Sequence, residues 1–470
     1  MTSRIKVIGG GLAGPEAALQ AVRRGCNVTL YEMRPHRSTE AHQTADFAEL
    51  VCSNSLKSES ENTAPWLLKQ EMRRAGSVLL AAADACAVPA GHALAVDRVE
   101  FSRRVAALIE KEPRITVVRE EVTSLAEDGD AITILASGPL TSPALTAELQ
   151  RLTGAEHLAF YDSISPIVDA ASIDMEKVYF AARYDKGTAD YINCPFTKEE
   201  YDAFLDALTT AEKVEPKSWE QIPTEPGAPG PSPLGTWVLT MPEQSEKLSY
   251  FEGCLPIEET ARRGRDTLRF GPMKPVGLTD PKTGRWPYAV VQLRQENLRA
   301  DSYNLVGFQN YLKFGEQARV LRLIPGLERA TFLRYGQIHR NTYIHAPSLL
   351  TETLQLKAHP RILIAGQLSG VEGYTESIAS GMLAGRYAAV LAQGRTPEPA
   401  PRLSANGSLT HYITHAAGSD NGKKFQPANI TFDLLPPLEE DLRKKIRDKK
   451  ERHKLQCDRA LAAWQRWLEA

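Results

Sequence analysis

Short apolar runs and a helical segment alternate at the start of the chain. Residues 5–8 form the first apolar run and residues 28–31 form the second. The segment 15–25 between them has helical composition, with a proline where a first turn tolerates it and Gly25 where a helix can end. This order predicts a strand, a glycine-rich turn, a helix and a second strand.

The pattern of apolar and polar positions predicts further elements along the chain. Residues 38–63 are polar and predict a loop, whereas residues 66–86 predict helix. Residues 97–125 predict a helix followed by a strand, and residues 131–140 predict another strand. Residues 361–394 repeat the order of strand, glycine turn and helix, and a proline-rich connector then leads to a charged C-terminal helix.

The composition is that of an ordinary globular protein. The chain has 470 residues, of which 42% are hydrophobic and 24% charged, so two or three domains with substantial cores are possible. The net charge of −2 gives no general attraction for nucleic acid, so a polyanionic partner needs a local basic patch. No secretory leader and no apolar run of membrane length is present, which predicts a cytoplasmic protein that does not bind membranes.

The six cysteines are scattered, without a CxxC pair and without a Cys/His cluster at metal spacing. This distribution fits a reducing compartment and predicts that the protein holds no metal.

A glycine loop lies between the first predicted strand and helix. Gly9, Gly11 and Gly14 form G-x-G-x-x-G, in which the glycines permit a tight turn, close approach to a pyrophosphate and close packing of helix on strand. Glu32 ends the second strand, where a carboxylate can accept a hydrogen bond from a ribose hydroxyl. The loop therefore predicts a dinucleotide site.

The end of the chain favours FAD over NAD as that dinucleotide. The strand ending near Gly366 and the glycine-flanked helix after it offer a second helix N-terminus, which flavoproteins of the glutathione-reductase type turn toward the flavin. A second GxGxxG is missing from the sequence, which argues against a separate nicotinamide domain.

We therefore expect an α/β protein with a Rossmann-like FAD-binding domain of glutathione-reductase type, an inserted mixed α/β domain and a C-terminal helical tail. A Pro/Gly-rich stretch at residues 223–237 predicts a loop inside the insertion. The expected parts are the first part of the FAD domain at 1–150, the insertion or substrate domain at 151–330, the closing part of the FAD domain at 331–395, and a linker with a helical tail at 396–470.

Two cysteines have surroundings that suit reactive thiols. Cys52 lies in the polar sequence ELVCSNSLKS, and Cys254 precedes an arginine-rich segment. Cationic neighbours favour the nucleophilic thiolate. The other four thiols are expected to be buried and inert: Cys26, Cys86, Cys194 and Cys457.

Long and unusual stretches of the chain resemble one known family. They are GGGLAGPEAA, ELVCSNSLKS, YFEGCLPIEE, GRDTLRFGPMKPVGL, VVQLRQENLRADSYNLVGFQ, YGQIHRNTYI and GQLSGVEGYTESIASGMLAG. They make the chain similar to the folate- and FAD-dependent tRNA (uracil-5-)-methyltransferases, which are related to flavoproteins that modify wobble uridines.

The resemblance implies a reaction and its participants. Methylenetetrahydrofolate gives a methylene group to the reduced flavin, which passes carbon and electrons to C5 of the T-loop uridine, and NADH or NADPH restores the flavin. It implies Cys254 as the nucleophile that activates uracil and Cys52 as the cysteine beside the flavin. It also implies FAD contacts at Gly9, Gly10, Gly11, Leu12, Ala13, Gly14, Glu32, Val122, Gly366, Gln367 and Gly370.

The sequence departs from the family pattern in two places. The stretch around 214–245 is longer than usual and leads into the Cys254 loop, and Pro15 replaces a small residue after the third glycine.

Two basic segments could hold RNA while a uridine turns outward. The segment after Cys254 is the expected RNA surface, and its cations are Arg262, Arg263, Arg265, Arg269 and Lys274. The run DLRKKIRDKKERHK near the C-terminus is interpreted as a solvated helix face because acids are interleaved with its cations. YGQIHRNTYIHAP adds His339, Arg340, Asn341 and Tyr343 as weaker folate or flavin pocket candidates.

Two alternative functions remain open. One is a wobble-uridine-modifying flavoprotein that works with a GTPase, and the other is a non-catalytic RNA-binding protein that retains flavin. The sequence does not distinguish a monomer from a homodimer.

Overall fold

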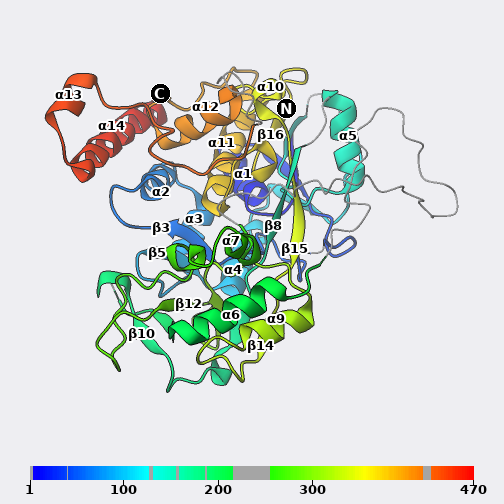
Figure 1. The fold of residues 1–470 in the computed structure, drawn as a ribbon. Coiled ribbons are helices and arrows are strands. Elements are labelled where there is room, and N and C mark those ends of the chain that lie inside the picture. The colour runs from blue at the N-terminus through cyan, green and yellow to red at the C-terminus, as the bar shows by residue number, and fades with distance from the viewer. Residues whose placement is uncertain are drawn as a thin grey trace.

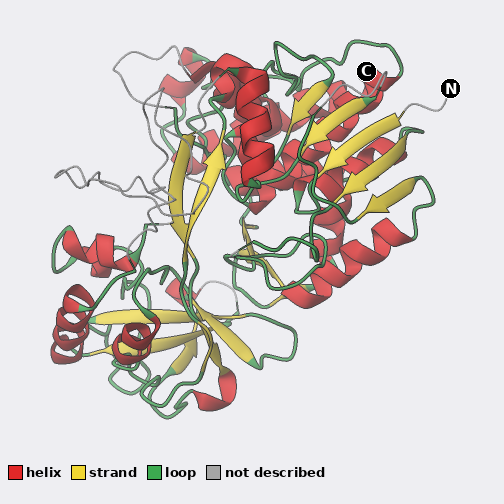
Figure 2. Ribbon diagram, turned by 90° about the vertical axis from the view of Figure 1, so that its right-hand side faces the viewer, coloured by secondary structure: helices red, strands yellow, loops and turns green. Residues whose placement is uncertain are grey.

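The computed structural model describes residues 4–39, 41–125, 131–154, 158–185, 188–214, 255–416 and 425–470. It consists of two bodies, one built on a parallel sheet and the other on an antiparallel sheet (Figure 2). Two long strands, β8 (Leu158–Ser163) and β15 (Ile338–Tyr343), pair antiparallel and run between the bodies. The chain therefore leaves the first body and later returns to it.

The first body is organised by a five-stranded sheet whose strands are all parallel. In the centre, Val7 lies opposite Leu30 on one side and Ile134 on the other, and all three are buried. Such burial is typical of a parallel sheet that is covered on both faces. The strands, in sheet order, are β16 (Ile362–Ile364), β7 (Ile132–Leu135), β1 (Arg4–Ile8), β2 (Asn27–Tyr31) and β6 (Ile115–Val118).

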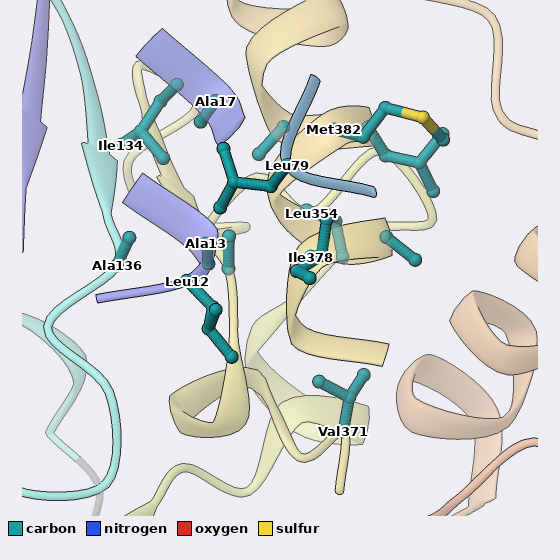
Figure 3. Close-up of a cluster of buried hydrophobic side chains, with 14 of the residues drawn as sticks. Leu12, Ala13, Ala17, Leu79, Ile134, Ala136, Leu354, Val371, Ile378 and Met382 are labelled. Atoms are coloured by element: carbon teal, nitrogen blue, oxygen red, sulfur yellow. The ribbon is translucent and has the colours of Figure 1, made fainter. Parts of the chain in front are cut away.

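Two helices that are far apart in the sequence pack closely in this body. They are α1 (Ala13–Val22) and α11 (Tyr374–Ala392), and every residue of α1 is buried. A Cβ atom at Gly381 would lie 2.3 Å from the Ala13 carbonyl oxygen, and one at Gly385 would lie 2.3 Å from the Ala17 oxygen. Both glycines therefore permit the close helix crossing, and Figure 3 shows Ala13 and Ala17 near Ile378 and Met382.

The helices predicted at 66–86 and within 97–125 are confirmed, but the first is divided in two because Gly76 has φ +75° and Ser77 caps the second part. They are α2 (Ala64–Arg74), α3 (Val78–Asp84) and α4 (Arg98–Glu110). Three further helices of the first body were not predicted: α5 (Pro143–Thr153), α10 (Ala346–Leu349) and α12 (Ala405–His415).

The expectation of a loop throughout 38–63 is wrong at its end. β3 (Ser55–Ser58) pairs antiparallel with β5 (Ala93–Val96), which in turn pairs with β4 (Ala87–Val88). The segment SLKS has only one apolar residue, Leu56, so its strand character comes from pairing with a distant segment.

The second body is an antiparallel sheet with the order β10-β11-β12-β13-β9-β14. Helix α6 contacts α7, α9 and β11, and a separate buried core lies between these elements. The strands are β9 (Ile167–Asp169), β10 (Tyr179–Ala181), β11 (Tyr191–Phe196), β12 (Ala289–Gln295), β13 (Ser302–Leu305) and β14 (Phe332–Arg334). The helices are α6 (Lys198–Thr210), α7 (Ile257–Arg262), α8 (Thr267–Phe270) and α9 (Phe314–Leu321), with 3-10 turns at Ala170–Ser172 and Arg183–Asp185.

The C-terminal helices α13 (Glu440–Lys445) and α14 (Lys449–Glu469) form a hairpin at one side of the molecule (Figure 1). The buried Trp464 anchors α14 by donating its indole N–H to the Glu71 carbonyl oxygen at 2.7 Å. The ring of Trp464 also stacks on Trp467.

The Glu71 carboxylate holds α2 and α12 together. Its two oxygens accept the backbone N–H groups of Ala405 and Asn406 at 2.7 and 2.9 Å, at the N-terminus of α12. Burial raises the pKa of Glu71 to about 7, although these hydrogen bonds act in the opposite direction. The folded protein therefore holds a proton on Glu71 at a pH at which an unfolded chain has lost it.

Wild-type protein is expected to lose stability as the pH is raised from 5 to 8, and Glu71→Gln is expected to lose less. Because the pKa of Glu71 is raised in the folded state, its protonated carboxyl group stabilises the fold fully below about pH 4.5. This stabilisation of about 3 kcal/mol is lost as the pH rises through 7. The thermal unfolding midpoint of wild type and variant should be compared across this range, with the exposed Glu61→Gln as control. An unchanged pH dependence in Glu71→Gln would contradict this account.

Candidate functional site

A cavity lies at the carboxyl ends of β1, β2 and β7. In open α/β sheets, ligands bind outside the carboxyl ends of parallel strands. The predicted residues that line it are Gly9, Gly10, Gly11, Leu12, Ala13, Glu32, Val122, Gly366 and Gln367.

The glycine loop forms one wall, and its three motif glycines have different surroundings. A Cβ atom at Gly14 would lie 1.8 Å from the Gly9 carbonyl oxygen, and one at Gly9, where φ is +113°, would lie 2.3 Å from the Ala136 oxygen. At Gly11 no atom lies within 4 Å of that position. Gly9 and Gly14 therefore permit backbone packing, whereas Gly11 leaves room for a ligand.

Two of the helices that reach the cavity, α1 and α11, begin without a side-chain cap. No side chain at Leu12, before α1, or at Gly373, before α11, accepts a hydrogen bond from the first helical turn. By contrast, α2 to α5 are each capped by a side chain, from Thr63, Ser77, Asp97 and Ser142 respectively. Uncapped N–H groups and the helix dipole make both ends suitable for anionic or hydrogen-bond-accepting ligand groups.

Glu32 is an ionised carboxylate on the cavity wall. It accepts hydrogen bonds from the Gly10 N–H at 2.8 Å and from the Arg34 side chain at 2.9 Å. Burial alone would raise the pKa of Glu32, but the hydrogen bonds and charge of Arg34, with the Gly10 N–H, bring the pKa below its ordinary value. Such a group can accept a hydrogen bond from a ribose hydroxyl.

Two predicted cofactor residues do not line the cavity. Gly14 lies against Gly9, and a Cβ atom at Gly370 would lie 2.6 Å from the Phe425 ring. Both are packing positions. Gly366 and Gln367 face the cavity from β16 and the 3-10 turn Gln367–Ser369.

Cys52 is half-buried beside the cavity, next to the lining residue Val51. Its backbone N–H and that of Ser53 donate to the Tyr374 hydroxyl at 2.7 and 3.2 Å, and its thiol lies 3.7 Å from the Ser163 carbonyl oxygen. Tyr374 is itself part of the cavity wall. Burial raises the pKa of the Tyr374 hydroxyl, which therefore keeps its proton.

Two arginines place positive charge near Cys52. Arg98 donates to the carbonyl oxygens of Leu50 and Cys52 and pairs with Glu296 of the second body. Arg98 and Arg334 both interact electrostatically with the Cys52 thiol. Positive charge favours the thiolate form of a cysteine.

The Cys52 loop lies where the two bodies meet. Arg294 of β12 donates to Ser53 and Asn54 at 2.8 and 2.9 Å, and Asn54 donates to the Gln295 carbonyl oxygen at 2.9 Å. Contacts from the second body therefore fix the Cys52 loop beside the cavity.

The prediction that four other thiols are buried is confirmed: Cys26, Cys86, Cys194 and Cys457. Burial raises the pKa of Cys86 to about 11 and that of Cys457 to about 12. It also raises the pKa values of Cys26 and Cys194. Cys254 and the stretch 215–253 before it lie outside the described residues.

The predicted RNA surface is exposed, but several of its charges are paired. Arg265 contacts Asp202 and Asp206 at 3.0 and 2.7 Å. Arg269 pairs with Asp266, and its guanidinium lies 3.6 Å from the centre of the Tyr288 ring. Arg262 pairs with Glu259. Arg263 and Lys274 lie exposed on the same segment. The neighbouring Phe270 is 80% exposed.

Two of the candidates on β15, Asn341 and Tyr343, are not among the residues that line the cavity. Asn341 is buried, and the Tyr343 hydroxyl donates to the Phe425 carbonyl oxygen at 3.1 Å. The side chains of His339 and Arg340 lie outside the described residues.

Several lining residues were not predicted from the sequence. The main ones are Arg34, His42, Glu49, Ser137, Thr141, Tyr374 and Ser377. The turn SGPLTS directly after β7 carries a usable signal, because residues that follow parallel strands meet at one sheet edge. Tyr374 and Ser377 are placed by the N-terminus of α11, which the glycine pattern did indicate.

In the described part of the chain, no helix has the length and hydrophobicity to cross a lipid bilayer.

Comparisons with known proteins place the chain among close relatives. The family model "Glucose inhibited division protein A" matches residues 4–225 and 238–396. A relative from Koribacter versatilis, named methylenetetrahydrofolate--tRNA-(uracil-5-)-methyltransferase TrmFO, is 65% identical over 468 residues, which cover 100% of this chain and 98% of that protein. A relative of the same name from Solibacter usitatus is 59% identical, with 100% of both chains covered. The solved structure of Aquifex aeolicus GidA shares the fold, with a TM-score of 0.67 at 15% identity, over 100% of this chain and 74% of that one.

Proposed function

The chain belongs to the family of methylenetetrahydrofolate--tRNA-(uracil-5-)-methyltransferases, and on this premise we propose that it methylates C5 of a uridine in the T-loop of tRNA. Methylenetetrahydrofolate is the one-carbon donor in this proposal, and NADH or NADPH is the reductant. The observation that carries the proposal is the place of Cys52, half-buried, surrounded by cations and tied to Tyr374 on the wall of the cavity. The cytoplasm is the proposed location.

The cavity fits FAD. Gly11 leaves room at the uncapped N-terminus of α1, where a pyrophosphate would accept hydrogen bonds, and Glu32 would bind the adenosine ribose. Gly366 and Gln367, with the start of α11, would hold the flavin end, as in proteins of the glutathione-reductase type. When bound, FAD supplies two-electron redox chemistry and a carrier for the one-carbon unit.

This placement also supports the proposed division of the chain. Residues 1–150 and 331–395 would together form the FAD domain, residues 151–330 the insertion that holds substrate, and residues 396–470 the linker with the helical tail. The strands β7 and β16, which come from the two separated parts, pair directly in one sheet.

The two cysteines would have different roles. The Cys254 thiolate adds to C6 of uracil, so that the electron pair of the C5–C6 bond makes C5 nucleophilic. After C5 has taken up the one-carbon unit at the methylene level, the C5 proton leaves to a base and the bond between the methylene and its carrier breaks. A hydride equivalent that derives from NADH or NADPH would then reduce the methylene to methyl, and the C6–sulfur bond breaks, which restores the C5–C6 double bond and frees the Cys254 thiolate. Cys52, held by Tyr374 and Arg98, guards or assists the transfer at the cavity.

The experiment that tests the function is mass analysis of a T-arm RNA incubated with the protein, methylenetetrahydrofolate and reduced nicotinamide. A gain of one methyl group at the T-loop uridine is expected. Product at a wobble uridine of whole tRNA would instead support the GTPase-linked alternative. A bound flavin that reduced nicotinamide cannot bleach would support the non-catalytic alternative.

We also propose that tRNA binds to the basic segment after Cys254, which contains Arg262, Arg263, Arg265, Arg269 and Lys274. This segment follows Cys254 directly, and RNA phosphates can replace the surface carboxylates that pair with its arginines. The C-terminal hairpin is the competing surface, because its exposed Lys449 and Lys450 have no ion pair with a described carboxylate.

Arg265→Glu combined with Arg269→Glu is expected to weaken tRNA binding by about tenfold and to reduce the slope of log affinity against log salt by about 2. Filter binding over a range of salt concentrations measures both. Arg103→Glu with Arg104→Glu is the matched control, because these exposed arginines also pair with a carboxylate, that of Glu100. A larger effect of Lys449→Glu with Lys450→Glu would move the RNA surface to the hairpin.

A further inference from the structure

Three side chains with metal-binding atoms meet outside the cavity. His411 and His415 lie on α12, and Glu352 lies in the turn after α10. The Glu352 Oε1 atom is 3.0 Å from His411 Nδ1 and 3.7 Å from His415 Nδ1. One ligand atom from each residue lies within 4.8 Å of the other two.

The local structure brings the three side chains together. His411 and His415 are four residues apart, which places them on one face of a helix, and their rings stack with centres 4.2 Å apart. Helices α10 and α12 are in contact, so the turn that follows α10 presents Glu352 to this face (Figure 1). The H-x-x-x-H spacing was visible in the sequence HYITH, but its third partner is 59 residues away.

The arrangement has the chemistry of a site for a divalent transition metal. Two imidazole nitrogens and one carboxylate oxygen are a common ligand set for Zn²⁺, at bond lengths of about 2.0–2.2 Å. Such bonds place neighbouring ligands of a tetrahedral site about 3.4 Å apart, and the two measured separations fall on either side of this value.

An ordinary ion pair accounts for only part of this geometry. A hydrogen bond between His411 and Glu352 explains the position of one histidine. It does not explain why His415 lies close to the same carboxylate oxygen. His415 Nδ1 lies 2.9 Å from the Thr414 hydroxyl as well, a contact that an ion would replace. The side chains of Glu352, His411 and His415 are 41%, 37% and 52% exposed, so an ion can enter and water can occupy a fourth position.

We propose that Glu352, His411 and His415 form a binding site for a divalent transition metal of the Zn²⁺ type, which modifies the expectation of a metal-free protein. The inference does not depend on the proposed reaction.

Bound metal would stabilise the wall of the cavity. The Leu356 N–H donates to the Ile362 carbonyl oxygen at 2.8 Å, and the Ile364 N–H donates to the Leu354 oxygen at 2.9 Å, so the turn with Glu352 is paired to β16. β16 leads directly to Gly366 and Gln367. An ion between Glu352 and α12 would therefore link α12 to the segment that carries these two residues.

The test is a Zn²⁺ titration of the metal-stripped, full-length protein at pH 7.5, followed by calorimetry and by thermal unfolding. We expect one Zn²⁺ per chain and a higher unfolding temperature. His411→Ala should weaken binding by at least about tenfold, and Glu352→Gln, which keeps the shape of an exposed side chain, should also weaken it. His92→Ala, an exposed histidine elsewhere, is the matched control and should bind like wild type.

Co²⁺ absorption separates this site from the cysteines. Ligation by nitrogen and oxygen gives only weak visible bands, whereas thiolate ligation adds an intense charge-transfer band. Weak bands that disappear in His411→Ala support the proposal. The proposal is overturned if wild type binds no Zn²⁺, if His411→Ala and Glu352→Gln bind it as wild type does, or if the bound Co²⁺ shows thiolate ligation.

Discussion

Cys254→Ala is expected to lower folate-dependent methylation of T-arm RNA by about a thousandfold or more, and to abolish the covalent complex with RNA that carries 5-fluorouridine at the target position. Without a thiolate at C6, C5 of uracil is too weak a nucleophile to take up the one-carbon unit. The fluorine at C5 cannot leave as a proton does, so an enzyme with its nucleophile intact remains attached. Denaturing gel electrophoresis detects this attachment.

Cys52→Ala separates the two proposed roles. It is expected to lose methylation to a similar extent but to keep the covalent complex, because Cys52 lies at the cavity wall with Tyr374. Cys86→Ala is the control, since this thiol is buried in the first body away from the cavity. A covalent complex in Cys254→Ala would reject the assignment of Cys254, and full methylation by Cys52→Ala would reject the assignment of Cys52.

Gly14→Ala is expected to lower the free energy of unfolding by about 3 kcal/mol or more and to prevent retention of FAD. The added methyl group would lie 1.8 Å from the Gly9 carbonyl oxygen, so the strand and the helix on either side of the loop would have to separate. Denaturant unfolding measures the stability, and flavin absorbance of the purified protein measures the FAD content.

Gly11→Ala tests the binding of FAD rather than the stability of the fold. Its methyl group meets no protein atom within 4 Å, so the stability of the apoprotein should change by less than about 1 kcal/mol. FAD affinity should nevertheless fall by about tenfold or more, because the methyl group enters the space assigned to the pyrophosphate. Gly315→Ala in α9 is the control, since it also meets no atom within 4 Å. Unchanged FAD affinity in Gly11→Ala would place the cofactor elsewhere.

The glycine-loop wall of the cavity was predictable because its signals are local. Strand β1, the glycine loop, α1 and the acid at Glu32 lie within about thirty consecutive residues, and their periodicity and spacing depend only on neighbours in the chain. The burial of Cys26 and Cys86 also follows from local position, because Cys26 stands at the entrance of a predicted strand and Cys86 at the end of an alanine-rich predicted helix.

Other features were missed because distant partners produce them. The strand Ser55–Ser58 exists through pairing with Ala93–Val96, and its own residues have little strand preference. The arginines after Cys254 looked like free positive charge, but Asp202 and Asp206 come from a helix some sixty residues earlier.

The sequence by itself therefore determined the α/β fold class, the glycine loop between the first strand and helix, and the family, because local periodicity and long matching stretches carry that information. Only the tertiary structure decided what surrounds Cys52: Tyr374 comes from the C-terminal part of the chain, Arg98 from α4 and Arg294 from the inserted body. It also brought Glu352 to His411 and His415. Contacts between distant segments arise from the packing of whole elements, and no short stretch of sequence specifies that packing.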